Sequence, residues 1–338
     1  MDFQREGQNA DADSLIEWMS HHLRKEDESL MKRCLCLLMA LLMLIPALPA
    51  LADDPQPIEI IPYEQLPAPA PGQHHYLLLC VDRWNASPSN LGNTDGIVLV
   101  TLDSYQHRVM LTSLIRDALV VRPDGHIGRV NYIAKNYSPE DLCKVLSQHY
   151  GIRIEKYILF DFQQIANIVD HLGGVDIEVN AEEASYLKKY PLSNTQTTPP
   201  MNGAGTYHFV GRAAVIYMRI RKAGNGGDFM RTQRVRTVLS LLADKCREIS
   251  YDDARKLVDS VMENTLLTNM NIDEMLTAMD YAYNLRDCTI EELRIPQDGQ
   301  YHAINYAAMA VQELDWPACR ESFRNFLNSS FLVFDDEE

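Results

Sequence analysis

The chain has 338 residues and a formal net charge of −16, with 46% hydrophobic and 23% charged residues. This composition is that of a packed globular protein and excludes a disordered or fibrous chain. A chain this acidic is not expected to bind nucleic acid through its overall electrostatic field.

The first 52 residues read as a polar tail followed by an export signal. Residues 1–30 are polar and show no core pattern, so they are either a cytoplasmic tail or the result of a start codon upstream of a true start at Met31. A basic Met31–Arg33, an apolar run over 34–48 and the small-x-small Ala50–Ala52 then form a secretory signal over 31–52. The apolar run is shorter than the ~20 residues of a spanning helix, which favours cleavage after Ala52 over retention as a membrane anchor. We expect an exported protein, anchored to or secreted at the outer face of the cell membrane.

The remaining chain divides into a linker, one domain and a tail. Residues 53–73 are rich in proline and are predicted to form an extended linker. The alternation of apolar segments that follows predicts one folded domain over 74–330. Residues 331–338 form an acidic tail.

Short apolar runs predict buried strands in the first half of the domain. Continuous apolar sequence over 76–81, 97–102 and 108–114 is typical of strands covered on both faces. Further strand-like segments are 157–162, 175–179 and 288–295.

Helical patterns alternate with these strands. Ser138-Pro139 opens a helix that extends to Tyr150, with serine as the cap and proline at the first position. The stripe over 162–172 ends at Gly173-Gly174, a helix stop. Residues 181–206 read as loop, and periodicity leaves 211–217 open between helix and strand. The remaining predicted helices are 228–248, 252–262, 271–283 and one from about 316. The alternation predicts an α/β fold with three layers, α/β/α.

Two aspartates stand where predicted strands meet a polar loop. Asp82 follows the first strand directly, and Asp95 precedes the second. Functional groups of α/β sheets gather at strand ends, and paired carboxylates suit a hard cation such as Mg²⁺. The same residues also fit simple loop capping, which is a common role of aspartate.

Arginines recur beside strand ends and glycine-rich turns. Arginine recognises phosphate through two parallel hydrogen bonds, so such a group in an acidic chain indicates an anionic ligand. For any single arginine, pairing with an acid on the solvated surface is the alternative interpretation. The group consists of Arg116, Arg129, Arg219, Arg221, Arg231 and Arg234.

Motifs of other enzyme classes are absent from the sequence. There is no phosphate-binding Gly-x-x-x-x-Gly-Lys-Ser/Thr loop, no Gly-x-Ser-x-Gly elbow and no His-Glu-x-x-His. The cysteines beyond residue 52 match no zinc spacing and leave open either two disulfides or buried thiols. Aspartate, arginine and a metal ion therefore favour phosphoryl or pyrophosphate chemistry over acyl transfer.

Several blocks taken together resemble the LytR-CpsA-Psr (LCP) family. The resemblance covers about 75–250 closely and extends to about 330. The order of separate blocks is more specific than any one of them. The blocks are Leu77–Asp82, Thr94-Asp95, Ser113–Asp117, Arg129–Asn131, Phe162–Asp176, Tyr217–Lys222 and Gly227–Arg234.

This resemblance implies an extracytoplasmic domain at the membrane surface, with a mixed central sheet flanked by helices. It implies a phosphotransferase that moves a glycopolymer, such as teichoic acid or capsular polysaccharide, from a polyprenyl-pyrophosphate carrier onto peptidoglycan with Mg²⁺. By analogy Asp82 and Asp95 hold the metal, and Asp117 acts as a base or orients an arginine. Arg116, Arg219, Arg221, Arg231 and Arg234 would clamp the pyrophosphate, with Arg129 in the place of a usual lysine.

The sequence departs from the family pattern in some places. Asn93 stands where the family usually has an arginine, and Gly96 where it has a threonine. Val235-Arg236 replaces a pair of glutamines. A prenyl chain needs an apolar groove, for which Phe160, Phe162, Ile165 and Val169 are candidates, although ordinary core packing is the better explanation of them. The alternatives to transfer are a lipid-pyrophosphate hydrolase and a non-catalytic binder of anionic glycopolymer or lipid.

Overall fold

The computed structural model describes residues 54–189, 201–221, 223 and 227–329. These described residues belong to one compact unit. The predicted tail, export signal and acidic C-terminus lie outside the described residues. Within the described ranges, none of the helices combines the length and the apolar character needed to cross a bilayer.

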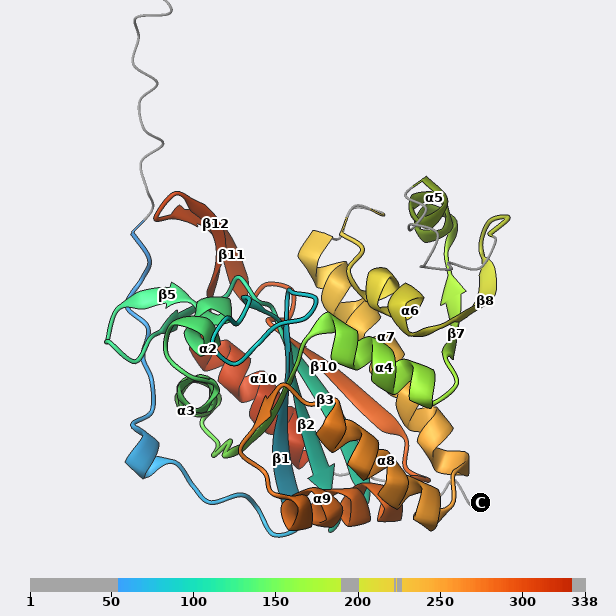
Figure 1. Cartoon of the computed structure of the whole chain (residues 1–338). Helices are drawn as coiled ribbons and strands as arrows, with labels where there is room; N and C mark the ends of the chain where they lie inside the picture. The colour runs from blue at the N-terminus through green and yellow to red at the C-terminus, as the bar shows by residue number, and fades with distance from the viewer. Residues whose placement is uncertain (1–53, 190–200, 222, 224–226, 330–338) are drawn as a thin grey trace, which may run out of the picture. The chain divides into compact units, whose positions relative to one another are not determined.

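A six-stranded mixed sheet forms the centre of the domain (Figure 1), which confirms the predicted fold class. The strand order is β10-β3-β2-β1-β6-β9. β1 runs antiparallel to β2 and parallel to β6, while β3 runs antiparallel to β2 and parallel to β10. The strands are β1 (Gln73–Val81), β2 (Thr94–Asp103), β3 (Arg108–Leu114), β6 (Lys156–Phe160), β9 (Leu267–Thr268) and β10 (Ile290–Ile295).

Helices lie on both sides of this sheet (Figure 1). One side carries α2 (Ile133–Asn136), α3 (Pro139–Tyr150) and α10 (Trp316–Asn328). The other carries α4 (Phe162–His171), α6 (Gly211–Met218), α7 (Gly227–Glu248), α8 (Tyr251–Glu263) and α9 (Ile272–Asn284). The caps follow the sequence signals, because Ser138 accepts the Asp141 N–H and Asp161 forms a capping box with Gln164.

The side chains of β1 alternate between the two sides. Leu77, Leu79 and Val81 are at most 1% exposed and pack with α3 and α10 in the main apolar cluster. Trp316 belongs to the same cluster and donates its indole N–H to the Leu119 carbonyl at 2.9 Å. The even-numbered residues of β1 are only half-buried and face the other helices. We call the first side the packed face and the second the open face.

A second apolar cluster supports the open face. It joins α4, α6 and α7 to α5 (Ala181–Lys189) and to the hairpin of β7 (Val175–Val179) and β8 (Gly205–Phe209). Gly211 lets α6 approach α4, since a Cβ there would lie 2.0 Å from the Ala166 carbonyl oxygen. The glycine is therefore required by the close contact of these two helices.

Two expectations for this region are changed by the structure. The loop predicted over 181–206 is wrong for its first part, which forms α5, and for residues 205–206, which begin β8. Asn180 and Glu183 form a reciprocal cap at the start of α5, a signal that the sequence does contain. The undecided segment 211–217 is helical.

Short elements complete the domain. The segment predicted as a linker contains the turn η1 (Tyr63–Gln65), and Leu66 within it is buried. Cysteines 80, 143, 246, 288 and 319 are free thiols, so the disulfide alternative is wrong for the described residues. Further elements are the hairpin β4 (Leu119–Val121) and β5 (Ile127–Arg129), the turn η2 (Val130–Tyr132), and the hairpin β11 (Tyr301–Tyr306) and β12 (Met309–Leu314).

Candidate functional site

The predicted aspartates lie where β1 ends and β2 begins. The pairing of these strands shifts by one residue between Cys80 and Val81, so Asp95 occupies a bulge in β2. Asp82 lies just past the end of β1, is exposed, and accepts the Asn93 N–H at 2.9 Å through Oδ1. Asp82 therefore shapes the loop in addition to any role in binding, whereas the Asp95 side chain is only 9% exposed.

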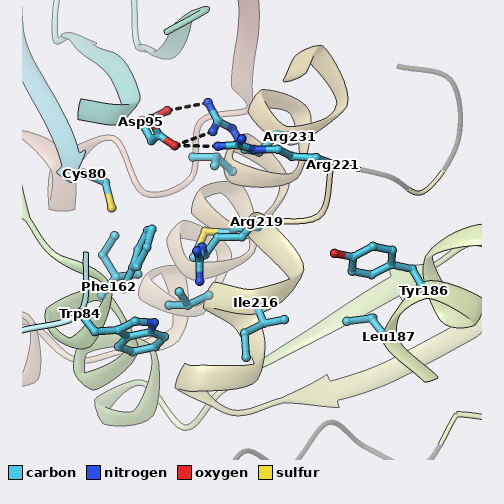
Figure 2. A pocket seen from close by; sticks show the side chains of 15 residues that line it. Cys80, Trp84, Asp95, Phe162, Tyr186, Leu187, Ile216, Arg219, Arg221 and Arg231 are labelled. Carbon is cyan, nitrogen blue, oxygen red and sulfur yellow. Dashed lines mark hydrogen bonds and ion pairs between the residues drawn. The ribbon is translucent and has the colours of Figure 1, made fainter. Parts of the chain in front are cut away.

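Three arginines converge on one oxygen of Asp95. Its Oδ2 lies 2.6 Å from Arg116 Nη1, 2.8 Å from Arg231 Nη1 and 2.9 Å from Arg221 Nη2. Figure 2 shows the contacts of Arg221 and Arg231 with Asp95 at the rim of the cavity. The fold thus brings together four of the predicted site residues from segments that are far apart in sequence.

Two more carboxylates extend this network. Asp117 contacts Arg116 at 3.3 Å and Arg129 at 2.9 Å. Asp228, at the N-terminus of α7, contacts Arg116 at 3.3 Å and Arg231 at 3.1 Å. Four guanidinium groups thus face three carboxylates, which leaves one formal positive charge in an acidic protein.

The pKa values of two part-buried carboxylates beside the arginines, Asp95 and Asp228, shift in opposite directions. Burial alone would raise the pKa of Asp95, but the hydrogen bond from Arg116 and the charge of Arg231 outweigh burial, and the pKa is lowered. For Asp228, burial outweighs the charges of Arg231 and Arg116, so its pKa is raised. Asp95 therefore remains ionised to a lower pH than a free aspartate, and Asp228 is the carboxylate that accepts a proton more readily.

A cavity of about 600 Å³ opens beside this network (Figure 2). Its polar part is formed by Asp95 with Arg219, Arg221 and Arg231. The rest of its wall is apolar and comes from β1, the following loop, and helices α4, α5, α6 and α7. These apolar and aromatic lining residues are Cys80, Trp84, Phe162, Ile165, Tyr186, Leu187, Val215, Ile216, Met218 and Val235.

Arg219 differs from the other arginines of the cavity. It is exposed, and its guanidinium lies 4.4 Å from the centre of the Phe162 ring. Among the described residues no carboxylate forms an ion pair with it, whereas Arg116, Arg221 and Arg231 all contact Asp95. Arg219 is thus the cation of the cavity that is most available to a ligand.

Other predicted site residues lie elsewhere. Arg234 is 1% exposed, pairs with Glu183 at 2.6 Å and donates to the Ile220 carbonyl, so it joins α7 to α5 and to the segment that follows α6. Phe160 and Val169, proposed as groove residues, do not line the cavity, and Val169 belongs to the second apolar cluster. The Arg231–Arg234 spacing places both on one helix face, but their partners differ.

The structure adds residues that the sequence analysis did not select. Asp228 lies in one of the sequence blocks that resemble the family, but the sequence analysis interpreted it only as the start of a helix. Trp84, two residues after Asp82, lines the cavity, where its ring lies 4.3 Å from the Arg212 guanidinium carbon. Tyr186 comes from the segment predicted as loop, so no helical pattern identified it.

A second, apolar cavity of about 370 Å³ lies on the same open face. Tyr76 and Leu78 line it, while Cys80, the next even-numbered residue of β1, lines the first cavity. Helix α7 contributes similarly, with Val235 in the first cavity and Leu239 in the second. Because alternate strand residues share a face, the two cavities lie in line along β1.

The carboxylates fit a cation only in part. Asp95 Oδ1 is buried and has no hydrogen-bond partner among the described groups, so it offers a free oxygen ligand. Within the described ranges, no group of three or more His, Cys, Asp or Glu side chains gathers as a metal site. A cation that keeps most of its water or phosphate ligands, as Mg²⁺ does, needs only such a sparse protein site.

Comparison with known proteins gives a family match over most of the chain. The model of the LytR_cpsA_psr family matches residues 64–320. A curated relative named polyisoprenyl-teichoic acid–peptidoglycan teichoic acid transferase TagV, from Bacillus subtilis, is 25% identical over 230 residues, 64% of this chain and 55% of that protein. Biofilm regulatory protein A of Streptococcus mutans is 25% identical over 206 residues, 58% of this chain and 50% of that protein. The chain thus spans about half the length of these two relatives.

Solved structures share the fold. The crystal structure of B. subtilis TagV aligns with a TM-score of 0.60 at 21% identity, covering 75% of this chain and 97% of that one. A structure described as TagT bound to LIIa-WTA aligns with a TM-score of 0.62 at 20% identity, covering 79% and 96%.

Proposed function

Because the chain belongs to the LytR-CpsA-Psr family, we propose that it transfers a glycopolymer from a polyprenyl-pyrophosphate carrier to peptidoglycan. The name of the curated relative TagV supports transfer of teichoic acid in that protein. The observation that carries the proposal for this chain is the cavity itself, with an arginine-rich rim and an apolar wall. This amphipathic combination suits a lipid with an anionic head.

The pyrophosphate binds at the rim in this proposal. Arg219 is available there, and Arg221, 47% exposed, releases its contact with Asp95 at little cost. Arg116 and Arg231 are more buried and held by several carboxylates, so they position the site. Arginine suits this role because its planar fork forms two parallel hydrogen bonds with phosphate oxygens.

The prenyl chain occupies the open face. The second cavity is lined almost entirely by apolar side chains and lies in line with the first. The apolar side chains of this cavity of about 370 Å³ are accessible to solvent while the cavity is empty. A ligand tail that covers them removes apolar surface from water, which is favourable by ~25 cal/mol per Å², so the cavity supports a lipid substrate.

The transfer step needs a proton acceptor. The acceptor hydroxyl oxygen forms a bond to the glycan-linked phosphorus, the bridging P–O bond of the pyrophosphate breaks, and the prenyl phosphate leaves. The hydroxyl proton passes to a carboxylate. Asp228 suits this because its pKa is raised by burial, while Asp117 is held between Arg116 and Arg129 and orients them.

Mg²⁺ is part of the proposal through the chain's own oxygens. Asp95 Oδ1 and the exposed Asp82 would hold the ion. When bound, the ion would neutralise negative charge on the phosphate oxygens. We likewise propose that the protein lies at the outer face of the cell membrane, because the sequence predicts an export signal over 31–52.

A prenyl pyrophosphate binding and turnover assay tests this function. Residues 54–338 would be incubated with Mg²⁺, a glycan-bearing prenyl pyrophosphate and peptidoglycan, with thermal shift and formation of prenyl phosphate as readouts. Arg219→Ala is expected to weaken binding about tenfold or more by removing an available phosphate contact, without loss of stability. Asp95→Asn is expected to abolish turnover while ligand binding persists.

Arg122→Ala is the matched control, because Arg122 pairs with Asp124 at the surface and does not line the cavity. Equal loss of binding in Arg122→Ala and Arg219→Ala would contradict the assigned rim. Binding without any turnover, even with a glycan-bearing lipid and peptidoglycan, would favour a non-catalytic binder. Prenyl phosphate formation that is insensitive to the acceptor would favour a hydrolase.

A further inference from the structure

The second cavity extends to the end of the sheet that lies opposite the network of arginines and carboxylates. Beyond Tyr76 of β1 its wall continues to Leu102 on β2, Val109 on β3 and Ile290 on β10. Cys288, two residues before β10 begins, also lines it. β10 runs parallel to β3, and the network begins just past the last residue of β3, so Cys288 marks the opposite end of the sheet.

Among the described residues, the only charged side chains that line this cavity are Arg247 and Arg286, and both lie at that end. Arg247 donates Nη2 to the Cys288 carbonyl at 2.8 Å. Arg286 lies two residues before Cys288, in a turn closed by the Cys288 N–H and the Leu285 carbonyl. On α7, Arg247 lies ~24 Å from Arg231 of the network, at about 1.5 Å per residue along the helix axis. The open face therefore has a second pair of arginines, separate from the first group.

Both arginines keep N–H groups for a ligand. The Arg286 guanidinium lies 4.3 Å from the centre of the Tyr283 ring and donates Nη1 to the Tyr283 carbonyl at 2.9 Å. Within the described part of the chain, no carboxylate forms an ion pair with Arg286. Arg247 pairs with Asp244 at 2.9 Å, but Asp244 is 57% exposed, so exchange of this contact for a ligand costs little. An anionic group at this end can therefore accept hydrogen bonds from both guanidinium groups.

We infer that the second cavity is a binding site for a single-chain lipid with an anionic head, such as a fatty acid, whose head binds Arg247 and Arg286. The alkyl chain extends from there along the apolar wall, and burial of the chain supplies most of the affinity. This ligand enters from the end opposite the pyrophosphate. It occupies the space assigned to the prenyl tail, so the two ligands compete, and only this competition rests on the proposed function.

Titration of laurate, in the absence of any prenyl compound, tests the inference. Dodecanol has the same chain length and no charge, so it measures the contribution of the chain alone. Wild type should bind laurate about tenfold more tightly than dodecanol, because hydrogen bonds between charged groups give a factor of this size. Arg286→Ala should lose this preference and retain its affinity for dodecanol.

Arg255→Ala is the matched control. Arg255 follows Ala254, which lines the cavity, but Arg255 is itself exposed and does not line it. This variant should bind laurate as tightly as wild type does. If Arg286→Ala folds poorly, Arg286→Gln removes the charge and keeps a hydrogen-bond donor for the Tyr283 carbonyl.

Equal affinity of wild type for laurate and dodecanol would overturn the inference, as would laurate binding that neither Arg286 variant changes, or no laurate binding at all. Lysophosphatidylglycerol distinguishes the sources of the head group, because tighter binding than laurate identifies a phosphate head and weaker binding a carboxylate. A final titration adds laurate to the complex with prenyl pyrophosphate. Laurate that binds through Arg286 without displacing prenyl pyrophosphate would support this site and contradict the placement of the prenyl tail in the second cavity.

Discussion

The two faces of the central sheet differ although they belong to the same strands. On the packed face, Leu77 and Leu79 are at most 1% exposed and contact a continuous apolar cluster that includes Trp316 and Phe323. On the open face, Tyr76 and Leu78 line a cavity of about 370 Å³. Stability is therefore supplied mainly by the packed face, and room for a ligand is provided by the open face.

The open face is not loose throughout. Arg234 and Glu183 form a buried ion pair that joins α7 to α5, and Arg236 pairs with Glu292 of β10. These two ion pairs hold α7 to its neighbours beside the cavities, in addition to the second apolar cluster. The predictions below test this division of roles, from the largest expected effect to the smallest.

Breaking the buried Arg234–Glu183 ion pair is expected to give the largest loss of stability. Arg234→Ala leaves Glu183 buried without its partner, which should lower the free energy of unfolding by about 3–5 kcal/mol. Urea denaturation followed by circular dichroism measures this. The double variant Arg234→Met, Glu183→Met should recover much of the loss, and a double variant as unstable as the single one would contradict the explanation.

Adjacent leucines of β1 compare the faces directly. Leu79→Ala on the packed face should cost about 3–4 kcal/mol, because it creates a new cavity in a close-packed core. Leu78→Ala only enlarges an existing cavity and should cost about 1–2 kcal/mol, mainly the lost transfer term. Equal losses in urea denaturation would remove the distinction between the faces.

Acid should weaken the packed face through His149. Burial lowers the pKa of this histidine to about 4, and its neutral ring is fixed because Nε2 accepts the Val121 N–H while Nδ1 donates to the Val145 carbonyl. The unfolded chain binds the proton at a higher pH, so stability is full above about 6.5 and falls as the pH drops towards 4, by about 3 kcal/mol in all. Unfolding free energies measured between pH 8 and pH 4, at intervals of about half a pH unit, would show this loss of stability.

A His149→Gln variant is the control for that prediction. It should lose this part of the pH dependence even where it is less stable than wild type. His75, whose pKa is also lowered to about 4 by burial, will retain a similar contribution. An unchanged slope in the variant would assign the acid sensitivity to other groups.

Enlarging neighbouring residues of β2 should have effects of opposite sign. Val100→Phe points into the empty cavity and should stabilise the protein by about 1 kcal/mol while blocking prenyl binding. Leu99→Phe points into the packed face and should destabilise it by about 1–3 kcal/mol through overpacking. Thermal unfolding of both variants, with and without prenyl pyrophosphate, measures the two effects, and destabilisation of both would mean that the cavity cannot accept additional side-chain volume.

Sequence patterns predicted the elements whose signals are local. The buried strands β1 to β3 are continuous apolar runs, and α3 carries its serine cap and first-position proline. The hairpin of β11 and β12 was missed because its turn contains Ala307 and Ala308 at positive φ instead of the usual Asn-Gly. Those positions are rarely occupied by alanine, so no turn signal marks them.

The site was predicted in its composition more than in its arrangement. Asp95, Arg116, Arg221 and Arg231 were all selected, and the structure brings them together. Only the tertiary fold reveals that three arginines share one oxygen of Asp95. The burial of Arg234 depends on Glu183, which lies in a helix that the sequence analysis did not recognise.

The shared oxygen of Asp95 has a consequence for selectivity between ligands. A carboxylate already occupies the point where three guanidinium groups meet, so a phosphate that binds Arg221 together with the available Arg219 must draw Arg221 away from Asp95. A small inorganic anion gains little from this exchange, because the charges are compensated before it arrives. An amphiphile gains additional free energy from its tail, so the empty site discriminates against the abundant simple phosphates of its surroundings.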